Sequence, residues 1–533
     1  MVNTRPIAAI DIGTNSVHLV VARPIDGGPP EVLTTEKAPI RLGSGSHDMK
    51  RLDPDAMSRA VDALDRFRQI AEAHNAEIVA VATSAVREAE DRSSFLKRVR
   101  DEAQIDVGVI SGVEEARLIH LGALGSVPAA DRRHLVIDIG GGSTEIVVGE
   151  GTTAILARSL KVGHIRLTNR FFPGGRIESD QVRACRRFVK AFIAPVAREV
   201  RERGFDVAIG CSGTIENLAL MAADRSGNPA RTVDNLALTR GALSDLADDI
   251  TSRLEPDDRV DIRCLDPHRV DVIVAGAILL RELCKAFDIL ELVVSAGALR
   301  EGVVLDRMQQ RESSGDALHH LSDLRRTSVL GTARRFEENI EHAQHATDLA
   351  LELFDESAAI HEMDEFERNI LEAAGLLHNV GRFVAHAAHH KHSYYLIRNS
   401  EHLAGFTENE IELIAQVARY HRKSDPRLKH AEFAALTDGD QHRVRVLGGI
   451  LRVAIALDRT YKRAVEQVTA LDDGTRLTVT AITAPDADVE LELFTARERV
   501  GLLATALHRD VGFTVGTSHR GALAHPSSPT NHD

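Results

Sequence analysis

Short apolar runs that alternate with amphipathic stretches dominate the first 310 residues. Ile7–Ile10, Val17–Ala22 and Glu31–Thr35 are separated by turns containing Gly and Pro, a pattern that predicts three strands in succession. A helix is expected at about 54–73, because Asp53 is suited to the N-cap and is followed by proline. Further strands are expected at Ile78–Ala82 and Val107–Ile110, with helices near 91–103 and 113–124.

The pattern restarts at residue 134. His134–Ile139 reads as a strand, a glycine-rich turn follows, and strands at Ile146–Gly149 and Ala154–Leu160 come next. This order repeats the opening of the chain and indicates an internal duplication of an α/β unit. Helices near 179–203 and 237–252 and strands near 206–210 and 291–295 complete the second copy.

The character of the chain changes to helices from about residue 318. Four helices are expected, at 338–354, 363–378, 408–422 and 443–465. Leu477–Ile482 and Val489–Phe494 alternate in polarity and predict a small β-hairpin, with a helix near 496–509 after it. The tail from Gly516 is rich in Ser, Pro, His and Asn, which is typical of disorder.

Charge and composition narrow the class of protein. The chain has 533 residues and a formal net charge of −14, which argues against nonspecific nucleic-acid binding. An anionic substrate would therefore need local positive charge. No apolar run reaches the ~18 residues that span a bilayer, no signal peptide is apparent, and the four cysteines form no C-x-x-C pair. We expect a cytoplasmic protein without stable membrane insertion, zinc site or disulfide framework.

Three glycine-containing turns carry the candidate chemistry. DIGTNS spans Asp11–Ser16, DIGGGSTE spans Asp138–Glu145 and GCSGT spans Gly210–Thr214, and each follows an apolar strand. Glycines allow the backbone N–H groups to surround an anion, and hydroxyl side chains add donors. The leading aspartates suit Mg²⁺, which prefers carboxylate and phosphate oxygens. Two such turns in duplicated units predict a clamp for phosphate, and the pattern resembles the actin-like ATPase superfamily.

Longer segments narrow this resemblance. SGVEEARLIHLGAL (111–124), AAIDIGTNSVHLVV, VATSAVREA, VIDIGGGSTE and ALREGVV (298–304) together resemble the exopolyphosphatase / guanosine-pentaphosphate phosphatase (Ppx/GppA) family. GCSGTIENL and DVIVAGA, and then HHKHSYYLIRNS and ARYHRK in the helical part, extend the resemblance from residue 8 to about 465.

The resemblance implies roles for individual residues. Glu115 matches the family's catalytic base for the attacking water, and Glu145 its second essential glutamate. Asp11, Asp138 and Glu145 are implied to hold Mg²⁺. The implied phosphate-binding residues are Arg87, Gly140, Gly141, Gly142, Ser143 and Thr144. Thr14, Asn15, Ser16 and Gly213, in the other two turns, are further candidates for phosphate binding. These residue types suit phosphoryl transfer, which needs an oriented water and neutralised phosphate charge more than covalent chemistry.

A second constellation lies in the helical part. His342, the doublet His378-Asn379 and Asp458 resemble the HD phosphohydrolase superfamily, in which two histidines and two aspartates hold a metal. Asparagine is a poor replacement for a bridging carboxylate, so we interpret this site as a structural remnant.

A cationic stretch follows in the same region. His389–His392 and the run from Arg419 to His430 contain many Lys, Arg and His residues. A cluster of charges is by default a solvated helix face. We favour a track that guides a polyanion along His390, Lys391, Arg422 and Lys423, because the segment lies within the family match and supplies positive charge that the acidic chain otherwise lacks; histidine protonation would strengthen it at lower pH.

The sequence thus predicts two actin-like (ribonuclease H-like) α/β domains, at 1–126 and 127–310, that form a cleft. An all-α HD-like domain at 318–465, a small α/β element at 466–515 and a disordered tail at 516–533 are expected after them. The expected function is exopolyphosphatase, acting as a homodimer; a pppGpp phosphatase using the same residues is the nearest alternative. An actin-like kinase and a non-catalytic sensor of polyphosphate or alarmone are further alternatives.

Overall fold

The computed structural model describes residues 5–25, 29–44, 50–127, 129, 131–230, 232–312, 317–336, 339–400, 402–485 and 487–517. The chain divides into two compact units. The first comprises Met1–Leu324 together with Leu403–Glu408, and the second comprises Arg325–His402 and Asn409–Asp533. Each unit is described by itself.

A five-stranded sheet opens the first unit, in the order β3-β2-β1-β4-β5. Its central strand β1 pairs antiparallel with β2 and parallel with β4. The strands are β1 Ile7–Ile12, β2 Ser16–Arg23, β3 Glu31–Pro39, β4 Glu77–Ala82 and β5 Val107–Val109. Helices α1 Pro54–Ala73, α2 Ser84–Glu88, α3 Arg92–Arg98 and the π-helical turn η2 Val99–Ala103 follow the strands in the chain.

A six-stranded sheet belongs to the same unit, in the order β10-β11-β9-β6-β7-β8. The strands are β6 Arg133–Ile139, β7 Thr144–Glu150, β8 Thr153–Leu160, β9 Val207–Cys211, β10 Ala237–Thr239 and β11 Glu291–Val294. Its main helices are α5 His164–Phe171, α6 Ser179–Arg203, α7 Ser212–Arg225, α8 Arg240–Ser252 and α10 Ile273–Ala286.

The two sheets repeat one topology. Strand β6 pairs antiparallel with β7 and parallel with β9, as β1 does with β2 and β4. The first turn of each copy closes in the same way, since Gly13 N–H donates to Ser16 O at 3.1 Å and Gly140 N–H to Ser143 O at 3.0 Å. The α/β fold class and the duplication predicted from the sequence are confirmed.

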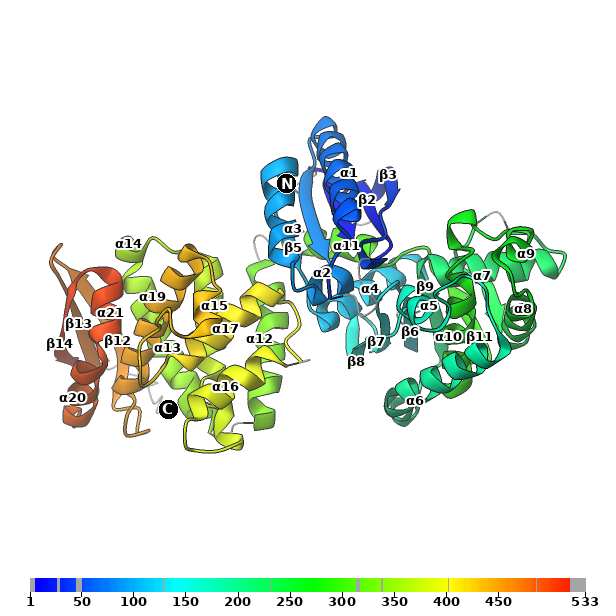
Figure 1. Ribbon diagram of the computed structural model, residues 1–533. Helices are drawn as coiled ribbons and strands as arrows, with labels where there is room; N and C mark the ends of the chain where they lie inside the picture. Colours follow the sequence, from blue (N-terminus) through cyan, green and yellow to red (C-terminus); the bar gives the residue numbers. More distant parts are fainter. Residues whose placement is uncertain are drawn as a thin grey trace, which may run out of the picture. The chain divides into compact units, whose positions relative to one another are not determined.

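Two helices form a layer shared by both sheets. Helix α4 Gly112–Ser126 packs on β6, β7 and β8, and α11 Leu299–Glu312 packs on α4, β1 and β2 (Figure 1). One apolar cluster joins residues of both sheets to these helices, including Ala9, Val147 and Ile119. The approach is very close, because a Cβ on Gly302 would lie 1.8 Å from Leu118 O. Both sheets are thereby packed against one pair of contacting helices.

Helices dominate the second unit. They are α12 Ala317–Phe336, which begins in the first unit, α13 Ile340–Glu356, α14 Ala358–His361, α15 Glu365–Leu377, α16 His389–Arg398, α17 Glu408–Arg419, α18 Ala431–Ala434 and α19 Asp438–Leu457, with the 3₁₀ turn η5 Val380–Phe383. Helix α19 is buried along most of its length and packs against α13 and α15. The helical character predicted for this region is confirmed.

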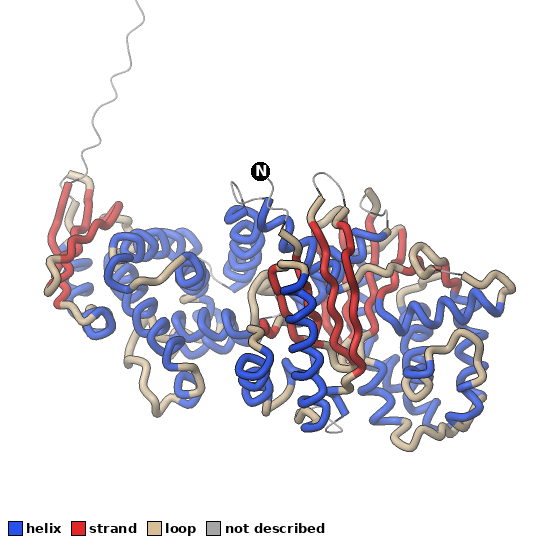
Figure 2. The backbone as a smooth tube through the Cα atoms, turned by 90° about the horizontal axis from the view of Figure 1, so that it is seen from above, coloured by secondary structure: helices blue, strands red, loops and turns tan. Residues whose placement is uncertain are grey.

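The small element at the end differs from the prediction in one respect. Val489–Phe494 is not a strand: it lies largely in helix α20 Glu490–Arg499, which is followed by α21 Gly501–Leu507. The hairpin is instead formed by β12 Val465–Asp472 and β13 Arg476–Thr483, and β14 Asp510–Thr517 pairs parallel with β13 (Figure 2). In this helix Leu491 and Phe494 are exposed, whereas Glu492 is buried and accepts from Thr460 N–H and Oγ1–H, so the alternation of apolar and polar residues does not correspond to alternating burial.

A short strap of the chain, Leu403–Glu408, belongs to the first unit although both its flanks belong to the second. Thr407 forms an antiparallel bridge with Ile110, and Gly405 N–H donates to Glu114 Oε2 at 2.8 Å. Among the described residues, no helix is long and apolar enough to cross a membrane, and all four cysteines are free thiols. Most of the predicted disordered tail, from residue 518, lies outside the described residues.

Candidate active site

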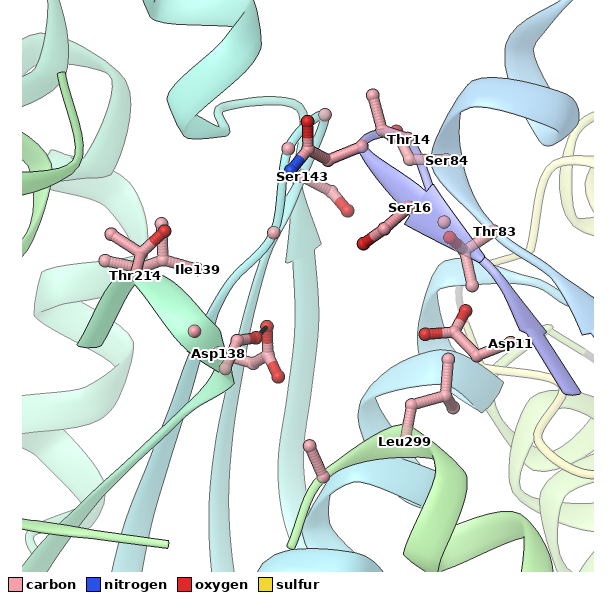
Figure 3. Close-up of a pocket in the computed structure, with 18 of the residues that line it drawn as sticks. Asp11, Thr14, Ser16, Thr83, Ser84, Asp138, Ile139, Ser143, Thr214 and Leu299 are labelled. Carbon is pink, nitrogen blue, oxygen red and sulfur yellow. Dashed lines mark hydrogen bonds between the residues drawn. The ribbon is translucent and has the colours of Figure 1, made fainter. Parts of the chain in front are cut away.

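A cavity of about 180 Å³ lies in the first unit where the two central strands end. Asp11, Thr14 and Ser16 enter it from one copy of the fold, and Asp138, Ser143 and Thr214 from the other (Figure 3). The remaining predicted site residues in its lining are Asn15, Glu115, Gly140, Gly141, Gly142, Glu145 and Gly213. All three glycine-containing turns therefore reach one cavity.

The loops of the two copies approach each other closely. A Cβ on Gly141 would lie 3.0 Å from Thr14 Cβ, and a Cβ on Gly163 would lie 2.4 Å from Gly141 O. Glycine is required at Gly163 because a Cβ there would overlap the backbone of the second copy's own loop, and a Cβ at Gly141 would press on the Thr14 side chain of the first copy. Thr144 differs from its neighbours: it is buried in β7, where its hydroxyl donates to Val162 O, and it is not part of the cavity lining.

The adjacent glutamates at the start of α4 have different surroundings. Ser111 caps the helix by accepting from Glu114 N–H at 3.2 Å. Glu114 pairs with Arg117 at 2.6 Å and accepts from the strap at Gly405, whereas Glu115 lines the cavity. Glu114 is therefore a structural residue, and Glu115 is the one that reaches the cavity.

Arg87 holds Glu115 in place. Its Nη1 donates to Glu115 Oε2 at 2.8 Å and to Ile110 O at 3.0 Å, and Arg87 is not itself part of the cavity lining. Burial raises the pKa of Glu115, and the charge and hydrogen bond of Arg87 oppose that rise. A carboxylate that is fixed in direction and has a raised pKa is suited to act as a general base for water.

Four further carboxylates share the cavity with Glu115: Asp11, Asp138, Glu145 and Glu216. Burial raises the pKa of Asp11 to about 7 despite the opposing charge of Arg300, and burial also raises that of Asp138 to about 7. Glu145 is the cross-strand neighbour of Asp138. Burial, and then repulsion from Glu115 and Asp138, raises the pKa of Glu145 well above its ordinary value.

Hydroxyl groups orient these carboxylates. Ser212 Oγ donates to Asp138 Oδ1 at 2.5 Å, and Ser159 Oγ donates to Glu145 Oε1 at 2.7 Å. Ser212 has φ +70°, a conformation that costs a non-glycine residue free energy and that occurs preferentially at functional sites. Asp11 Oδ1 is buried without any partner among the described residues.

The carboxylates fit a divalent metal ion. Mutual repulsion and one unpartnered buried oxygen are features that a bound cation would relieve. No group of three His, Cys, Asp or Glu in the described part of the chain is close enough to hold an ion alone. Mg²⁺ is typically bound by one or two carboxylates with waters and substrate phosphates, so the absence of a closed cage agrees with a substrate-dependent site.

Cationic residues that the sequence reasoning did not single out complete the lining. They are Lys37, Arg269 and Arg300, with His18 and His164 beside them. Arg300 Nη1 donates to His18 Nδ1 at 3.1 Å, and His18 Nε2 is 2.7 Å from Ser16 Oγ. Arg269 lies directly over Gly213, where a Cβ would be 1.9 Å from Nη2. Arg300 could have been found from the sequence, because it lies in the family-like segment ALREGVV, whereas Arg269 lies in none of the recognised motifs.

The residues predicted in the helical part all belong to the second unit. His342, His378, Asn379 and Asp458 line one cavity, discussed below. Of the predicted track, Lys391 and Lys423 are exposed and Arg422 is half-buried. His390 is buried, and burial lowers its pKa to about 4, so any positive charge that it adds to the track at lower pH would require a pH near 4.

Family models match most of this chain. The model for the Ppx/GppA phosphatase family matches residues 20–311, and the model for domain III of Ppx/GppA phosphatases matches residues 324–495. The chain belongs to the Ppx/GppA phosphatase family. Its predicted family resemblance is thus confirmed, and a phosphatase assignment disfavours the kinase alternative.

Similar proteins within the family include both a guanosine-pentaphosphate pyrophosphatase and an exopolyphosphatase. A guanosine-5'-triphosphate,3'-diphosphate pyrophosphatase of Photobacterium profundum is 30% identical over 84% of this chain and 86% of its own length. Among solved structures, an exopolyphosphatase of Cytophaga hutchinsonii is 29% identical, covering 57% of this chain and 98% of its own, with a TM-score of 0.54. The Aquifex aeolicus Ppx/GppA family member is 28% identical, covering 58% and 99%, with a TM-score of 0.51.

Proposed function

We propose that this Ppx/GppA phosphatase is an exopolyphosphatase that releases terminal orthophosphate from inorganic polyphosphate. The observation that carries the proposal is the cavity itself, in which a buried glutamate oriented by an arginine shares one space with glycine-rich loops and three basic side chains. The exopolyphosphatase named among its structural relatives supports the same substrate class.

In the proposed reaction, Glu115 accepts a proton from a water that attacks the terminal phosphorus. The bond from that phosphorus to the bridging oxygen breaks, and orthophosphate and a chain shorter by one unit are formed. The N–H groups of Gly140–Ser143 and the cations Arg269, Arg300 and Lys37 would neutralise phosphate charge as it shifts to the leaving oxygen. Asp11, Asp138 and Glu145 would hold Mg²⁺, which supplies further charge neutralisation on phosphate oxygens.

Hydrolysis of pppGpp is the second candidate. The Photobacterium profundum pyrophosphatase favours it, because the similarity to that protein extends over 84% of this chain. The terminal phosphate of pppGpp would meet the same carboxylates and loops. The two activities differ in what lies beyond the terminal phosphates, which is a nucleoside in one case and more phosphate in the other.

Turnover of both substrates by the purified chain tests the proposal. We expect Mg²⁺-dependent release of orthophosphate, with a higher kcat/KM for long-chain polyphosphate than for pppGpp. The reverse order would make the pyrophosphatase activity the main function. Tight binding of either compound without phosphate release would leave only the sensor alternative. Sedimentation analysis of the same preparation tests the predicted homodimer.

A further inference from the structure

A second cavity, of about 130 Å³, lies wholly within the second unit. It is lined by His342, His378, Asn379, Arg382, His389, His421, Arg422, Ile455, Asp458, Arg459, Tyr461 and Arg499. These residues come from the ends of helices α15, α17 and α19 and from α13, α16 and α20. The cavity is roomy enough for several waters, and hence for one phosphate-sized anion.

Positive charge predominates around this cavity. Four arginines line it, and Asp458 is the single carboxylate among the lining residues. In the described part of the chain none of the four arginines is ion-paired: Arg382 donates to Tyr461 Oη at 2.8 Å and Arg422 to His389 Nδ1 at 3.1 Å. Arg499 is surrounded by Arg459, Arg422 and Arg452, which together with burial lower its pKa. Unpaired guanidinium groups that converge on a cavity are typical of phosphate sites.

Asp458 is already engaged. It accepts from His342 Nδ1 at 2.6 Å and from Arg463 N–H at 3.2 Å. Among the described residues, Asp458 forms no ion pair with the four arginines, and its single negative charge leaves the lining net positive. A negative ligand would balance the remaining charge.

An unpartnered buried nitrogen supplies an independent sign of a ligand. His378 is 1% exposed, and its Nδ1 lies 2.6 Å from Gly375 O, so Nδ1 carries the proton of the neutral ring. Nε2 is then a bare acceptor, and it has no partner among the described residues. An acceptor in an arginine-lined cavity matches an anion that also carries an O–H group.

Hydrogenphosphate is such an anion, since it has negative oxygens for the guanidinium groups and one O–H for an imidazole. A metal ion would also use bare imidazole nitrogens. The arginines oppose a cation, and no three His, Cys, Asp or Glu of the described chain lie close enough to share one. The chemistry of the lining therefore favours the anion.

We propose that this cavity of the helical unit binds a protonated phosphate group. Arg382, Arg422, Arg459 and Arg499 would donate to its negative oxygens, and its O–H group would donate to His378 Nε2. The site is separate from the cleft that carries the proposed hydrolysis. Free orthophosphate and the terminal phosphate of a polyphosphate chain share this chemistry. In either case the end product or the substrate of the reaction would occupy a second position on the same chain.

Hydrogen-exchange mass spectrometry of the full chain, titrated with orthophosphate without divalent metal, tests the site. We expect protection of peptides covering 375–383 and 418–423. The midpoint should shift by about 10- to 100-fold in Arg382→Gln and in Arg499→Gln, the loss expected for one hydrogen bond to a charged group. Arg497→Gln is the matched control, because Arg497 lies on the same helix with its side chain exposed. Arg499→Lys retains the charge and should weaken binding less.

Two further arms make the result decisive. Arg269→Gln alters the cleft and should leave protection of the second unit unchanged. Tripolyphosphate replaces orthophosphate in a parallel titration, and protection by tripolyphosphate alone would identify the occupant as a chain end. The proposal is overturned if neither compound protects these peptides, if Arg382→Gln and Arg499→Gln bind like the wild type, or if the purified chain retains a stoichiometric transition metal that His378→Asn removes.

Discussion

At the scale of single residues, the pair Glu114 and Glu115 shows how neighbouring identical side chains take unrelated roles. One is tied to Arg117 and the strap, and the other is turned to the cavity and held by Arg87. The pair offers an internal control, since the same substitution can be made at consecutive positions.

Glu115→Gln removes the proposed base while keeping size and hydrogen bonding. We expect kcat to fall about 10²–10⁴-fold, which is the usual loss of general acid–base catalysis, with little change in substrate binding. Steady-state phosphate release measures kcat, and binding of an unreacted polyphosphate measures affinity. A variant that keeps near wild-type kcat would exclude Glu115 from this role.

Glu114→Gln should have the opposite profile. It weakens a buried charge-assisted pair with Arg117, so we expect the free energy of unfolding to fall by about 1.5–3 kcal/mol. The kcat of the folded variant should stay within a few-fold of the wild type. Chemical denaturation gives the stability, and a catalytic loss as large as that of Glu115→Gln would contradict this division of roles.

Gly213→Ala tests the position of Arg269. The new Cβ would lie 1.9 Å from Arg269 Nη2 and must displace the guanidinium from the cavity. We expect KM for polyphosphate to rise about 10- to 100-fold, the loss of one hydrogen bond to a charged group. Gly241→Ala is the control, because a Cβ there meets nothing within 4 Å. Equal KM values for the two variants would remove Arg269 from substrate binding.

The residues that could be read from the sequence are those that stand in contiguous turns. Asp11, Asp138, Glu145 and the glycines follow apolar strands directly, so their convergence follows from the duplicated topology. Arg269 comes from a short 3₁₀ turn far along the chain and reaches the cavity only through tertiary packing. The burial of His390 likewise depends on neighbours that are distant in sequence. The sequence alone therefore predicts more positive charge for this segment at neutral pH than the structure supports.

At the scale of elements, the contact of α4 with β6 and β7 depends on a buried histidine pair. His120 Nε2 lies 2.6 Å from His134 Nε2, and Gly149 makes room for both rings, since a Cβ there would be 2.3 Å from His120 Nε2. Burial, and then the neighbouring His134, lowers the pKa of His120 to about 3.

This pair predicts acid sensitivity. His120 is neutral in the folded chain and must take up a proton on unfolding below its ordinary pKa of 6.5. Its contribution to stability is therefore complete above pH 6.5 and is lost as the pH falls towards 3. Between pH 7 and pH 5 the loss from this residue should be about 2 kcal/mol.

Comparison with His120→Gln isolates the effect. Other buried histidines titrate in both proteins, so the difference in unfolding free energy between the two pH values is the quantity to measure. The wild type should lose about 2 kcal/mol more than the variant on going from pH 7 to pH 5. Parallel pH profiles would show that His120 is protonated equally in the folded and unfolded chains.

Element prediction succeeded where an apolar run stood beside a glycine-containing turn, even a run as short as Ile7–Ile10. Val489–Phe494 alternates in polarity over six residues without such a turn, and it is largely helical. Its two glutamates are helix formers, and the buried Glu492 accepts from Thr460.

At the scale of the whole molecule, a long polyphosphate must extend beyond a cavity of about 180 Å³. The exposed cations Lys391 and Lys423 of the second unit remain candidates for contact with the phosphate units that extend beyond this cavity. Lys391→Gln combined with Lys423→Gln should raise KM for long polyphosphate about two- to tenfold and weaken its dependence on salt. The kcat should change little.

Short substrates provide the control for this prediction. Tripolyphosphate or pppGpp should be cleaved by the double variant with nearly unchanged KM, because few phosphates reach past the cleft. Equal losses on short and long substrates would mean that the two lysines act through folding, and the track should then be abandoned.

The strap at Leu403–Glu408 makes the first unit dependent on a segment that follows part of the second unit in the chain. The solved relatives described above match 57–58% of this chain with nearly their whole length, so a catalytic core of that size exists without the helical unit. Here the polypeptide leaves the core, builds part of that unit, and returns to place Thr407 beside Ile110 and Gly405 on Glu114 before leaving again. Truncation at residue 312 would therefore remove the strap and uncover Ile110 and Glu114, the residue adjacent to the proposed base Glu115.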